Sequence, residues 1–370
     1  MGYKAFGPII FGFSKWLHNS TKELNIDKIY FLSRDGFIIK KAYDMLFEKS
    51  NTYYMFASRR AFSVPNVYPN MQYKEVCDVL NLSRSITIET FKKKLGIEKI
   101  CYNENELNNT KFSIDSNELK EFFHKNRDLI FCNAEKERKA LVNYLREISF
   151  CGNVAIVDIG WFGNMQKSLE KICIDNVMDA KINGFYVGKR HGYKDNMRNG
   201  FLFDNCKNKD ISIAIDSMNA LFESCFLADH GSVRSYISNI EFFPCEYNNE
   251  DLLLIKDFQQ GALRFVKDFS IFLPYVNLSS KDSFKIFFKE FCFPRKEIAI
   301  KFGNLTFYDY NLVNIAQPRN MYVYFKNPAL FFSDFRYCNW KIGFLTRVFN
   351  FRWLWYPCYY VYRRLRNCIQ

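Results

Sequence analysis

The run NVAIVDIGWFGNMQKSLEK, residues 153–171, begins with consecutive apolar residues, turns at Asp158, Gly160 and Gly163, and ends in apolar residues at helical spacing. Residues 28–46, KIYFLSRDGFIIKKAYDML, repeat this order of strand, acidic glycine-containing turn and helix. Continuous apolar strands that lead into helices are typical of a parallel sheet with crossover helices. We therefore predict an α/β fold with a mostly parallel, Rossmann-like sheet.

Two more strands fit this scheme. YYMFA, residues 53–57, ends at Ser58-Arg59-Arg60, and INGFYVG, residues 182–188, ends in Lys189-Arg190-His191-Gly192. Between the second and third units, residues 116–131 and 134–148 have helical periodicity and predict an inserted helical layer. We expect an α/β catalytic domain over residues 1–240, a helical region over 241–334, and a basic aromatic tail over 335–370.

The composition narrows the class of protein. The chain has 370 residues, of which 48% are hydrophobic and 25% charged, as in ordinary globular proteins. No stretch has the long uncharged apolar run of a membrane-spanning helix. The formal charge of +13 and the aromatic content of 18% are unusual, and they favour anionic partners: nucleic acid, anionic lipid or phosphorylated substrates.

The tail favours the lipid among these partners. From Phe335 to the end there is no acidic residue, and arginines alternate with Phe, Trp and Tyr. This pattern matches an interfacial anchor on an anionic membrane surface, although a helix docked on the core with solvated arginines also fits it. Nucleic acid is disfavoured because no nucleic-acid fold signature accompanies the charge. The N-terminus lacks a signal peptide, so we expect a cytoplasmic protein, peripheral on the cytoplasmic membrane.

Polar residues gather where the predicted strands end, which in a parallel sheet is where ligands bind. Guanidinium groups match phosphate geometry, and backbone N–H groups at glycines before a helix receive phosphates. Taken singly, an Asp-Gly pair is usually a turn and an Arg-Arg pair a solvated face, but a parallel sheet brings these ends together. The combination predicts a phosphorylated-sugar site, in which Asp158 holds sugar hydroxyls or Mg²⁺. The candidates for the phosphates are Ser33, Arg34, Gly36, Ser58, Arg59, Arg60, Gly160, Gly163 and Asn164.

The absence of several motifs narrows the range of possible activities. The chain has no Walker A loop, no G-x-G-x-x-G, no G-x-S-x-G and no D-x-D. Kinases, dinucleotide oxidoreductases, serine hydrolases, D-x-D sugar-nucleotide transferases and haloacid-dehalogenase phosphatases are therefore disfavoured. Its twelve Cys and four His show no clustered metal-ligand spacing, so no zinc site is predicted.

Five segments together resemble a known module. They are Gly7-Pro8 with F-x-x-W-L (13–17), I-Y-F-L-S-R-D-G (29–36), S-R-R (58–60), V-D-I-G-W-x-G-x-x-Q (157–166) and E-x-x-x-x-A-x-x-G-S-V (223–233). They look like the C-terminal module of bacterial polysaccharide-cluster proteins that begin with a haloacid-dehalogenase phosphatase domain. This module is similar to the glycan phosphoribosyltransferase module of two-domain ribofuranosyltransferases, and the resemblance covers about residues 7–236.

The resemblance implies transfer of a phosphoribosyl group from phosphoribosyl pyrophosphate to a glycan, here a lipid-linked one, in surface polysaccharide biosynthesis. This chain lacks the phosphatase domain, so a separate phosphatase would remove the 5-phosphate. In that reaction Asp35 would orient or deprotonate the acceptor and Asp158 would hold the ribose, with Mg²⁺ as the cofactor to consider. Trp161 would stack on an acceptor sugar unless it packs beside the sheet. Gln166, Glu223 and His230 complete the acceptor or sugar site. The alternatives are a non-catalytic phosphoglycan-binding or assembly module and a haloacid-dehalogenase relative that has lost D-x-D-x-T.

Overall fold

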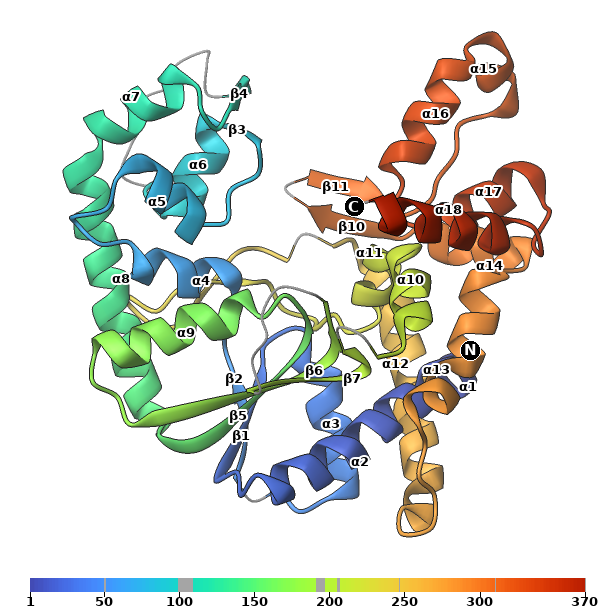
Figure 1. Cartoon of the computed structure of the whole chain (residues 1–370), viewed down its shortest axis with the longest axis horizontal. Helices are drawn as coiled ribbons and strands as arrows, with labels where there is room; N and C mark the ends of the chain where they lie inside the picture. Colours follow the sequence, from blue (N-terminus) through green and yellow to red (C-terminus); the bar gives the residue numbers. More distant parts are fainter. Residues whose placement is uncertain are drawn as a thin grey trace.

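A five-stranded, fully parallel sheet forms the centre of the molecule, in the order β2-β1-β5-β6-β7 (Figure 1). The computed structural model describes residues 1–49, 51–98, 109–190, 197–204, 207–245, 247–309 and 311–369. The sheet confirms the predicted α/β fold, and it adds one strand, β7, that the sequence analysis did not identify. The strands are β1 (Lys28–Leu32), β2 (Thr52–Met55), β5 (Gly152–Trp161), β6 (Ala180–Lys189) and β7 (Arg198–Asp204).

Each face of the sheet has its own core because successive side chains of a strand point to opposite faces. Ile29 and Phe31 of β1 belong to one buried cluster, and Tyr30 and Leu32 belong to another. Around the first face lie α1 (Gly2–Ala5), α2 (Gly7–Glu23), α3 (Gly36–Leu46), α12 (Asn249–Phe269) and α13 (Ser280–Cys292). Over the second face lie α4 (Arg59–Ser63), α8 (Arg127–Glu147) and α9 (Asn164–Asp175).

The inserted layer has a third core of its own, built from residues 64–134. The break between its two long helices falls at Asn126, whose side-chain amide donates to the Phe122 carbonyl at 2.8 Å, so the predicted break at 131–134 is wrong. The elements before α8 are η1 (Val64–Asn66), α5 (Tyr73–Val79), β3 (Ser85–Thr87), α6 (Ile88–Leu95), β4 (Lys111–Ser113) and α7 (Asn117–Lys125).

The C-terminal half returns to the first core. Within the predicted helical region over 241–334, α12 ends at Phe269, where η3 (Ser270–Phe272) follows. The remaining elements are α10 (Lys209–Asp216), α11 (Asn219–Ser224), β8 (Val233–Ser235), β9 (Glu241–Phe242), α14 (Lys296–Gly303), β10 (Thr306–Asp309), β11 (Asn311–Asn314), α15 (Met321–Lys326), α16 (Pro328–Tyr337), α17 (Lys341–Phe349) and α18 (Trp355–Ile369).

The segment 335–370 is packed on the protein over much of its length. Trp340, Ile342 and Phe344 are fully buried in the first core, and Tyr356 is buried there too. The Trp340 indole N–H donates to the carbonyl of Phe291 at 3.0 Å. Removing the whole segment would therefore open the core.

Two of the three arginines of α18 are also engaged. Arg363 forms an ion pair with Asp216 of α10, and Arg364 lies 3.4 Å from a carboxylate oxygen of Asp210. Of the two interpretations of the tail, the docked helix describes α17 and α18, with Arg363 and Arg364 paired and Arg366 exposed to solvent. Within the described ranges, no helix has the length and apolar character needed to cross a membrane.

Candidate functional site

Two aspartates from neighbouring strands meet at the carboxyl edge of the sheet. Asp35 is the residue before α3, and Asp158 lies in β5, which pairs with β1. The two carboxyl groups lie close enough for Asp158 to raise the pKa of Asp35 both through its charge and through a hydrogen bond. Asp158 is only 5% exposed, although the sequence analysis places it where a strand ends. The reason is that β5 is the central strand and continues beyond Asp158 to Trp161.

Burial is the main reason that the pKa of each aspartate is raised. The charge of Asp158 raises the pKa of Asp35 further, while the guanidinium groups of Arg34 and Arg59 lower it. Arg59 and the backbone N–H groups of Ile159 and Gly160 lower the pKa of Asp158 in part. The pair therefore holds a proton at a pH at which ordinary aspartates are ionised. One oxygen of Asp158, Oδ1, is buried and has no hydrogen-bond partner among the described residues.

A third carboxylate, Glu223 of α11, joins the pair electrostatically. Its Oε1 accepts hydrogen bonds from the Trp161 indole N–H at 2.6 Å and from the Asn219 amide at 2.7 Å. Burial raises the pKa of Glu223, and the charge of Asp35 raises it further. The site is thus a cluster of three acids that are hard to ionise together.

Arg59 is the cation that these acids share. It is exposed at the start of α4, and its charge lowers the pKa of Asp35, Asp158 and Glu223. Its guanidinium makes no hydrogen bond or ion pair with any residue that the structure describes. It is therefore the arginine best placed to receive an anionic ligand beside the acids.

Arg60, the next residue, has a structural role. Its guanidinium forms a two-pronged ion pair with Glu137 of α8, at 2.5 and 2.9 Å, and donates to the carbonyl of Arg234. Glu137 is buried, so this pair is a structural one. The phosphate-binding role predicted for Arg60 is corrected accordingly.

The two predicted serines also bind the fold together. The Ser33 hydroxyl donates to the Ala57 carbonyl at 2.8 Å and accepts from the Ala57 N–H at 2.9 Å. The Ser58 hydroxyl donates to the Val233 carbonyl at 2.6 Å and accepts from the Ala61 N–H at 3.0 Å, capping α4. Because both hydroxyls are buried and engaged, we assign the serines to positioning and not to direct phosphate contact.

The turn after β5 requires glycine. Gly160 has a φ of +104°, and a Cβ there would lie 2.5 Å from the Gly188 carbonyl oxygen of β6. Gly163, with a φ of +66°, precedes α9, which begins at Asn164. On the β1 side, Gly36 lets α3 begin against the backbone of Phe31, 2.9 Å from where a Cβ would lie. These glycines bring the two aspartates and the start of α9 into one place.

Trp161 turns into the protein instead of toward a ligand. Its ring is buried, stacks on Phe203 at 5.7 Å between centroids, and lies under the Arg190 guanidinium at 4.6 Å. Gln166 is also fully buried, and its amide is held by Tyr186, Glu170 and backbone carbonyls. Trp161 is therefore corrected from sugar stacking to holding Glu223, and Gln166 from sugar binding to bracing α9 against β6.

His230 reaches the site through Tyr54. The Arg34 backbone N–H donates to the Tyr54 hydroxyl at 2.9 Å, and that hydroxyl lies 2.7 Å from His230 Nε2. The other ring nitrogen lies 2.9 Å from the Gly231 carbonyl, which only a protonated Nδ1 can satisfy. The Tyr54 hydroxyl then donates to His230 and fixes the loop that carries Asp35. The Arg34 side chain lies against Tyr247, 3.5 Å from its hydroxyl.

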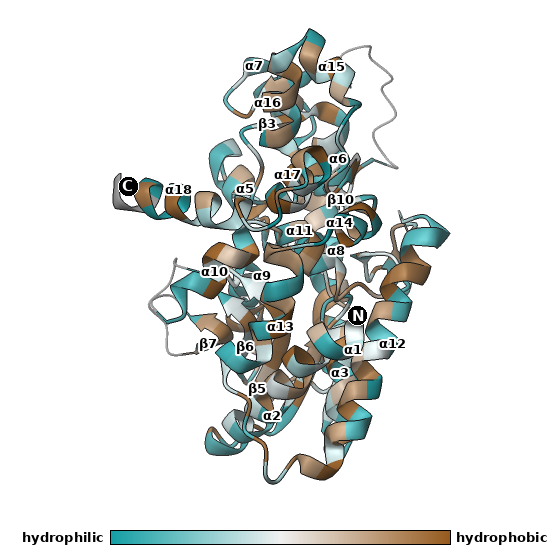
Figure 2. Cartoon of the chain, turned by 90° about the vertical axis from the view of Figure 1, so that its right-hand side faces the viewer, coloured by the Kyte–Doolittle hydropathy of each residue, from teal (hydrophilic) through white to brown (hydrophobic). Residues whose placement is uncertain are grey.

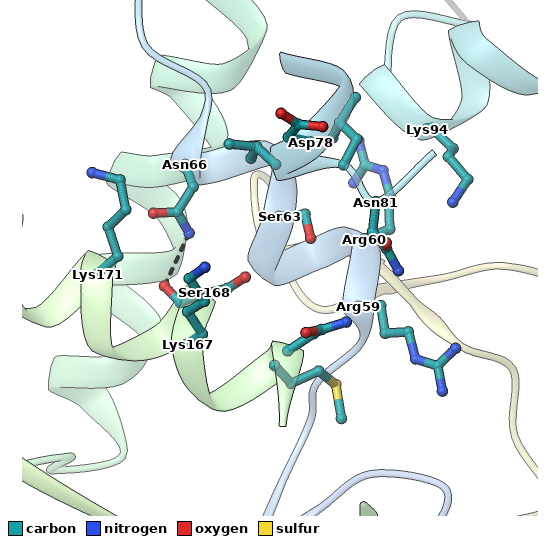
Figure 3. Close-up of a pocket in the computed structure, with 14 residues that line it drawn as sticks. Arg59, Arg60, Ser63, Asn66, Asp78, Asn81, Lys94, Lys167, Ser168 and Lys171 are labelled. Atoms are coloured by element: carbon teal, nitrogen blue, oxygen red, sulfur yellow. Dashed lines mark hydrogen bonds between the residues drawn. The ribbon is translucent and has the colours of Figure 1, made fainter. Parts of the chain in front are cut away.

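A cavity of about 440 Å³ extends from Arg59 between α4, α9 and the inserted layer (Figure 3). Its ionisable lining residues are five cations and the single acid Asp78, and two of the cations, Arg60 and Lys171, are paired with Glu137 and Asp175. The excess of cations still favours an anion. Asn66 lies in its wall, is 2% exposed, and has an amide oxygen without a hydrogen-bond partner among the described residues. The lining residues are Arg59, Arg60, Ser63, Asn66, Asp78, Val79, Leu80, Asn81, Lys94, Asn164, Met165, Lys167, Ser168 and Lys171.

The sequence analysis missed several residues of this site. Tyr54, Asn219 and Lys94 belong to segments whose polar residues carry no motif, so no local signal marked them. Arg190 follows a predicted strand, and that position could have indicated a site residue. The structure shows its guanidinium paired with Asp216 at 2.6 Å and placed over the Trp161 ring. His191 and Gly192, which follow it, lie outside the described residues.

Comparison with known proteins adds no identification: no protein-family model matches the chain, and no curated protein matches it in sequence. Whether the site could hold a metal ion must therefore be judged from its residues. Among the described residues there is no group of three His, Cys, Asp or Glu side chains that could hold a metal ion. Mg²⁺ commonly uses only one or two carboxylates together with substrate phosphates, and Asp35 with the unpartnered Oδ1 of Asp158 fits that requirement.

Proposed function

We propose that this protein is a glycosyltransferase of surface polysaccharide biosynthesis that transfers a phosphoribosyl group from phosphoribosyl pyrophosphate to a glycan acceptor. The observation that carries the proposal is the hydrogen-bonded pair Asp35 and Asp158, with Arg59 beside both acids and also in the wall of the basic cavity. A phosphorylated sugar needs cations for its phosphates and a carboxylate at the reacting carbon. Arg59 is the residue that joins the acid pair to the cavity, because it belongs to both.

Each residue has a role in the proposed transfer. The acceptor hydroxyl oxygen forms a bond to the anomeric carbon, and the bond from that carbon to the pyrophosphate oxygen breaks. Pyrophosphate leaves with the bonding electrons, while the hydroxyl proton passes to an ionised oxygen of Asp35. A carboxylate with a raised pKa is a stronger base than an ordinary one, which favours Asp35 for this step. Arg59 and Arg34 stabilise the charge of the departing pyrophosphate.

Asp158 and the start of α9 hold the sugar. The free oxygen of Asp158 accepts a ribose hydroxyl, and Asn164 and the cavity cations take the terminal phosphate. Bound Mg²⁺ would neutralise pyrophosphate charge, and Asp35 and Asp158 are the residues that would hold it, the free oxygen of Asp158 then serving the metal in place of the ribose hydroxyl. In this proposal the protein works at the cytoplasmic face of the membrane on a lipid-linked acceptor, and a separate phosphatase removes the 5-phosphate from the product.

The decisive experiment incubates the protein with phosphoribosyl pyrophosphate, Mg²⁺ and a panel of lipid-linked glycans, and detects a phosphopentose adduct by mass spectrometry. Asp158→Asn should abolish the adduct, while Asp44→Asn is the matched control. Asp44 lies on α3, downstream of Asp35, and its carboxylate pairs with Lys40 at 2.6 Å and accepts a hydrogen bond from the Thr52 hydroxyl at 3.2 Å. Absence of an adduct on every acceptor, despite donor binding, would contradict transfer.

The second candidate is a phosphoglycan-binding module without catalysis. The basic cavity favours it, because the cavity can bind a phosphorylated glycan whether or not the acids react. Calorimetry with phosphorylated glycans and with phosphoribosyl pyrophosphate separates the two. Tight binding of the glycan alone, unaffected by Asp35→Asn, supports the binding module.

A further inference from the structure

We propose that the hairpin formed by α15 and α16, together with the loop between α17 and α18, is the surface by which this protein binds an anionic lipid bilayer. This proposal depends on the proposed function only for the lipid-linked acceptor that makes a membrane necessary. Six exposed rings define the surface, which we call the aromatic surface: Tyr322, Phe325, Phe332, Tyr337, Phe351 and Trp353.

The degree of exposure is the first argument. Phe325 is 78% exposed, Tyr337 74%, Phe332 66% and Trp353 62%. In Figure 1 the hairpin projects from the body of the molecule, and Figure 2 shows hydrophobic residues along α16. Large apolar side chains that project together into solvent mark a binding surface, because single exposed rings scattered over a protein are normal but a group of them is not.

Ring contacts make the surface continuous although its residues come from two segments. Phe332 touches Phe331 of the same helix, and Phe331 touches Phe349 at 5.7 Å between centroids. Phe349 in turn contacts Trp355, which contacts Phe351 at 6.4 Å. The hairpin and the loop are thus parts of one packed patch whose outer rings are exposed.

The charge around the aromatic surface indicates that its partner is anionic lipid. Residues 316–370 carry nine Lys and Arg and only one acid, Asp334, whose carboxylate is paired with Arg319 at 2.8 Å. Arg363 and Arg364 are paired with acids of α10, so the cations that can serve the surface are the other six. Three exposed rings each have a cation beside them. The pairs are Lys326 with Tyr322 at 4.5 Å, Arg336 with Tyr337 at 5.9 Å, and Arg352 with Trp353 at 4.5 Å. Rings at headgroup depth with cations against anionic lipid are the composition of an interfacial anchor.

A second exposed apolar patch serves as a comparison. Ile271, Phe272 and Tyr275 lie at the turn between α12 and α13, at the opposite end of the molecule from α15 (Figure 1). Tyr275 is 85% exposed, but the charges near it are balanced between Lys and Asp residues. This patch has the apolar side chains without the excess of cations, so it is a matched control.

The test is sedimentation with vesicles of phosphatidylcholine alone and of phosphatidylcholine with phosphatidylglycerol. We expect the full chain to bind the anionic vesicles, more weakly as salt rises, and to bind neutral vesicles poorly. The double variant F325S/F332S should lose about tenfold or more of its partitioning, and K326E/R336E should lose binding to the anionic vesicles in particular. The control I271S/Y275S should bind as the original protein does.

Three outcomes would overturn the proposal. The first is failure of the original protein to bind anionic vesicles, and the second is undiminished binding by F325S/F332S. The third is a dimer in light scattering that F325S/F332S dissociates, without vesicle binding, which would assign the surface to a second copy of the chain. Failure of the proposed function is distinguishable, since the original protein would then bind vesicles but form no phosphopentose adduct. Circular dichroism and phosphoribosyl pyrophosphate binding of F325S/F332S report separately on its fold.

Discussion

The loops after β1 and β2 begin alike, with Ser33-Arg34 in one and Ser58-Arg59 in the other, and then diverge at the third residue. In both, the serine hydroxyl bonds to backbone carbonyls and fixes the loop. In the first loop Asp35 bonds to Asp158, in the second Arg60 pairs with Glu137. The same local pattern thus forms a functional centre in one loop and a structural ion pair in the other, and the partner supplied by a distant strand or helix makes the difference.

The largest effect should come from Asp35→Asn. Asparagine keeps the shape and removes the base, so transfer should fall by about 10²- to 10⁴-fold, the usual contribution of a general base. Donor binding and the circular dichroism spectrum should persist. Turnover at the original rate would show that Asp35 takes no part in the reaction. The loop after β1 would then have a structural role only, like the loop after β2.

Arg60→Ala should act on the fold instead. It leaves Glu137 buried without its cation, and breaking a buried pair in this way costs about 3–5 kcal/mol of the free energy of unfolding. Urea denaturation measures the loss. Restoring much of the stability with the double replacement of Arg60 and Glu137 by Leu would show that the unpaired charge is the cause. A variant as stable as the original would mean that Arg60 is free for ligands after all.

Arg59→Ala should affect ligand binding, in contrast to Arg60→Ala, which should affect folding. Loss of one charge-assisted hydrogen bond to a phosphate costs about 1.5–3 kcal/mol, so the dissociation constant for phosphoribosyl pyrophosphate should rise about 10- to 150-fold. The midpoint of urea denaturation should fall less than in Arg60→Ala, because Arg59 is exposed and outside any described ion pair, although its charge lowers the pKa values of the three acids. Unchanged donor affinity, measured by calorimetry, would place the phosphates elsewhere.

The acid pair predicts a pH dependence of stability. The folded pKa values of Asp35 and Asp158 are raised, so the folded chain binds more protons than the unfolded chain above about pH 4. The free energy of unfolding contributed by the pair therefore falls as pH rises from there through the folded pKa values, by about 1.4 kcal/mol per pKa unit. Denaturation of the original protein and of Asp35→Asn at a series of pH values should show the smaller loss in the variant. A steeper fall of the free energy of unfolding with pH in the variant would contradict the raised pKa values of the pair.

The smallest expected effect is that of Trp161→Phe. Phenylalanine keeps the stacking on Phe203 but removes the hydrogen bond to Glu223, worth about 0.5–1.5 kcal/mol. Stability should fall by that amount and transfer by no more than about tenfold. A loss of acceptor affinity with unchanged stability would reinstate the direct sugar contact that the buried ring argues against.

Much of the fold follows from local sequence. The apolar runs at 28–32 and 152–161 are continuous because those strands are covered on both faces, and the helical periodicity after each turn places the crossovers. The strand at 198–204, RNGFLFD, begins with two polar residues and a glycine and has only three consecutive apolar residues, so its sequence does not distinguish it from a loop. Its place in the sheet depends on pairing with β6.

For the site, the sequence by itself determined which residue types follow the strands: Asp35, Arg59, Asp158 and the glycines at 160 and 163. It placed them at one edge because parallel strands end on the same side. Only the tertiary structure decided their partners. Arg60 is neutralised by a glutamate 77 positions away, Trp161 is drawn inward by Glu223, and the rings of α15 and α16 stay exposed while Trp340 is buried. Pairing and burial depend on contacts between residues far apart in the chain, and local patterns carry no record of those contacts.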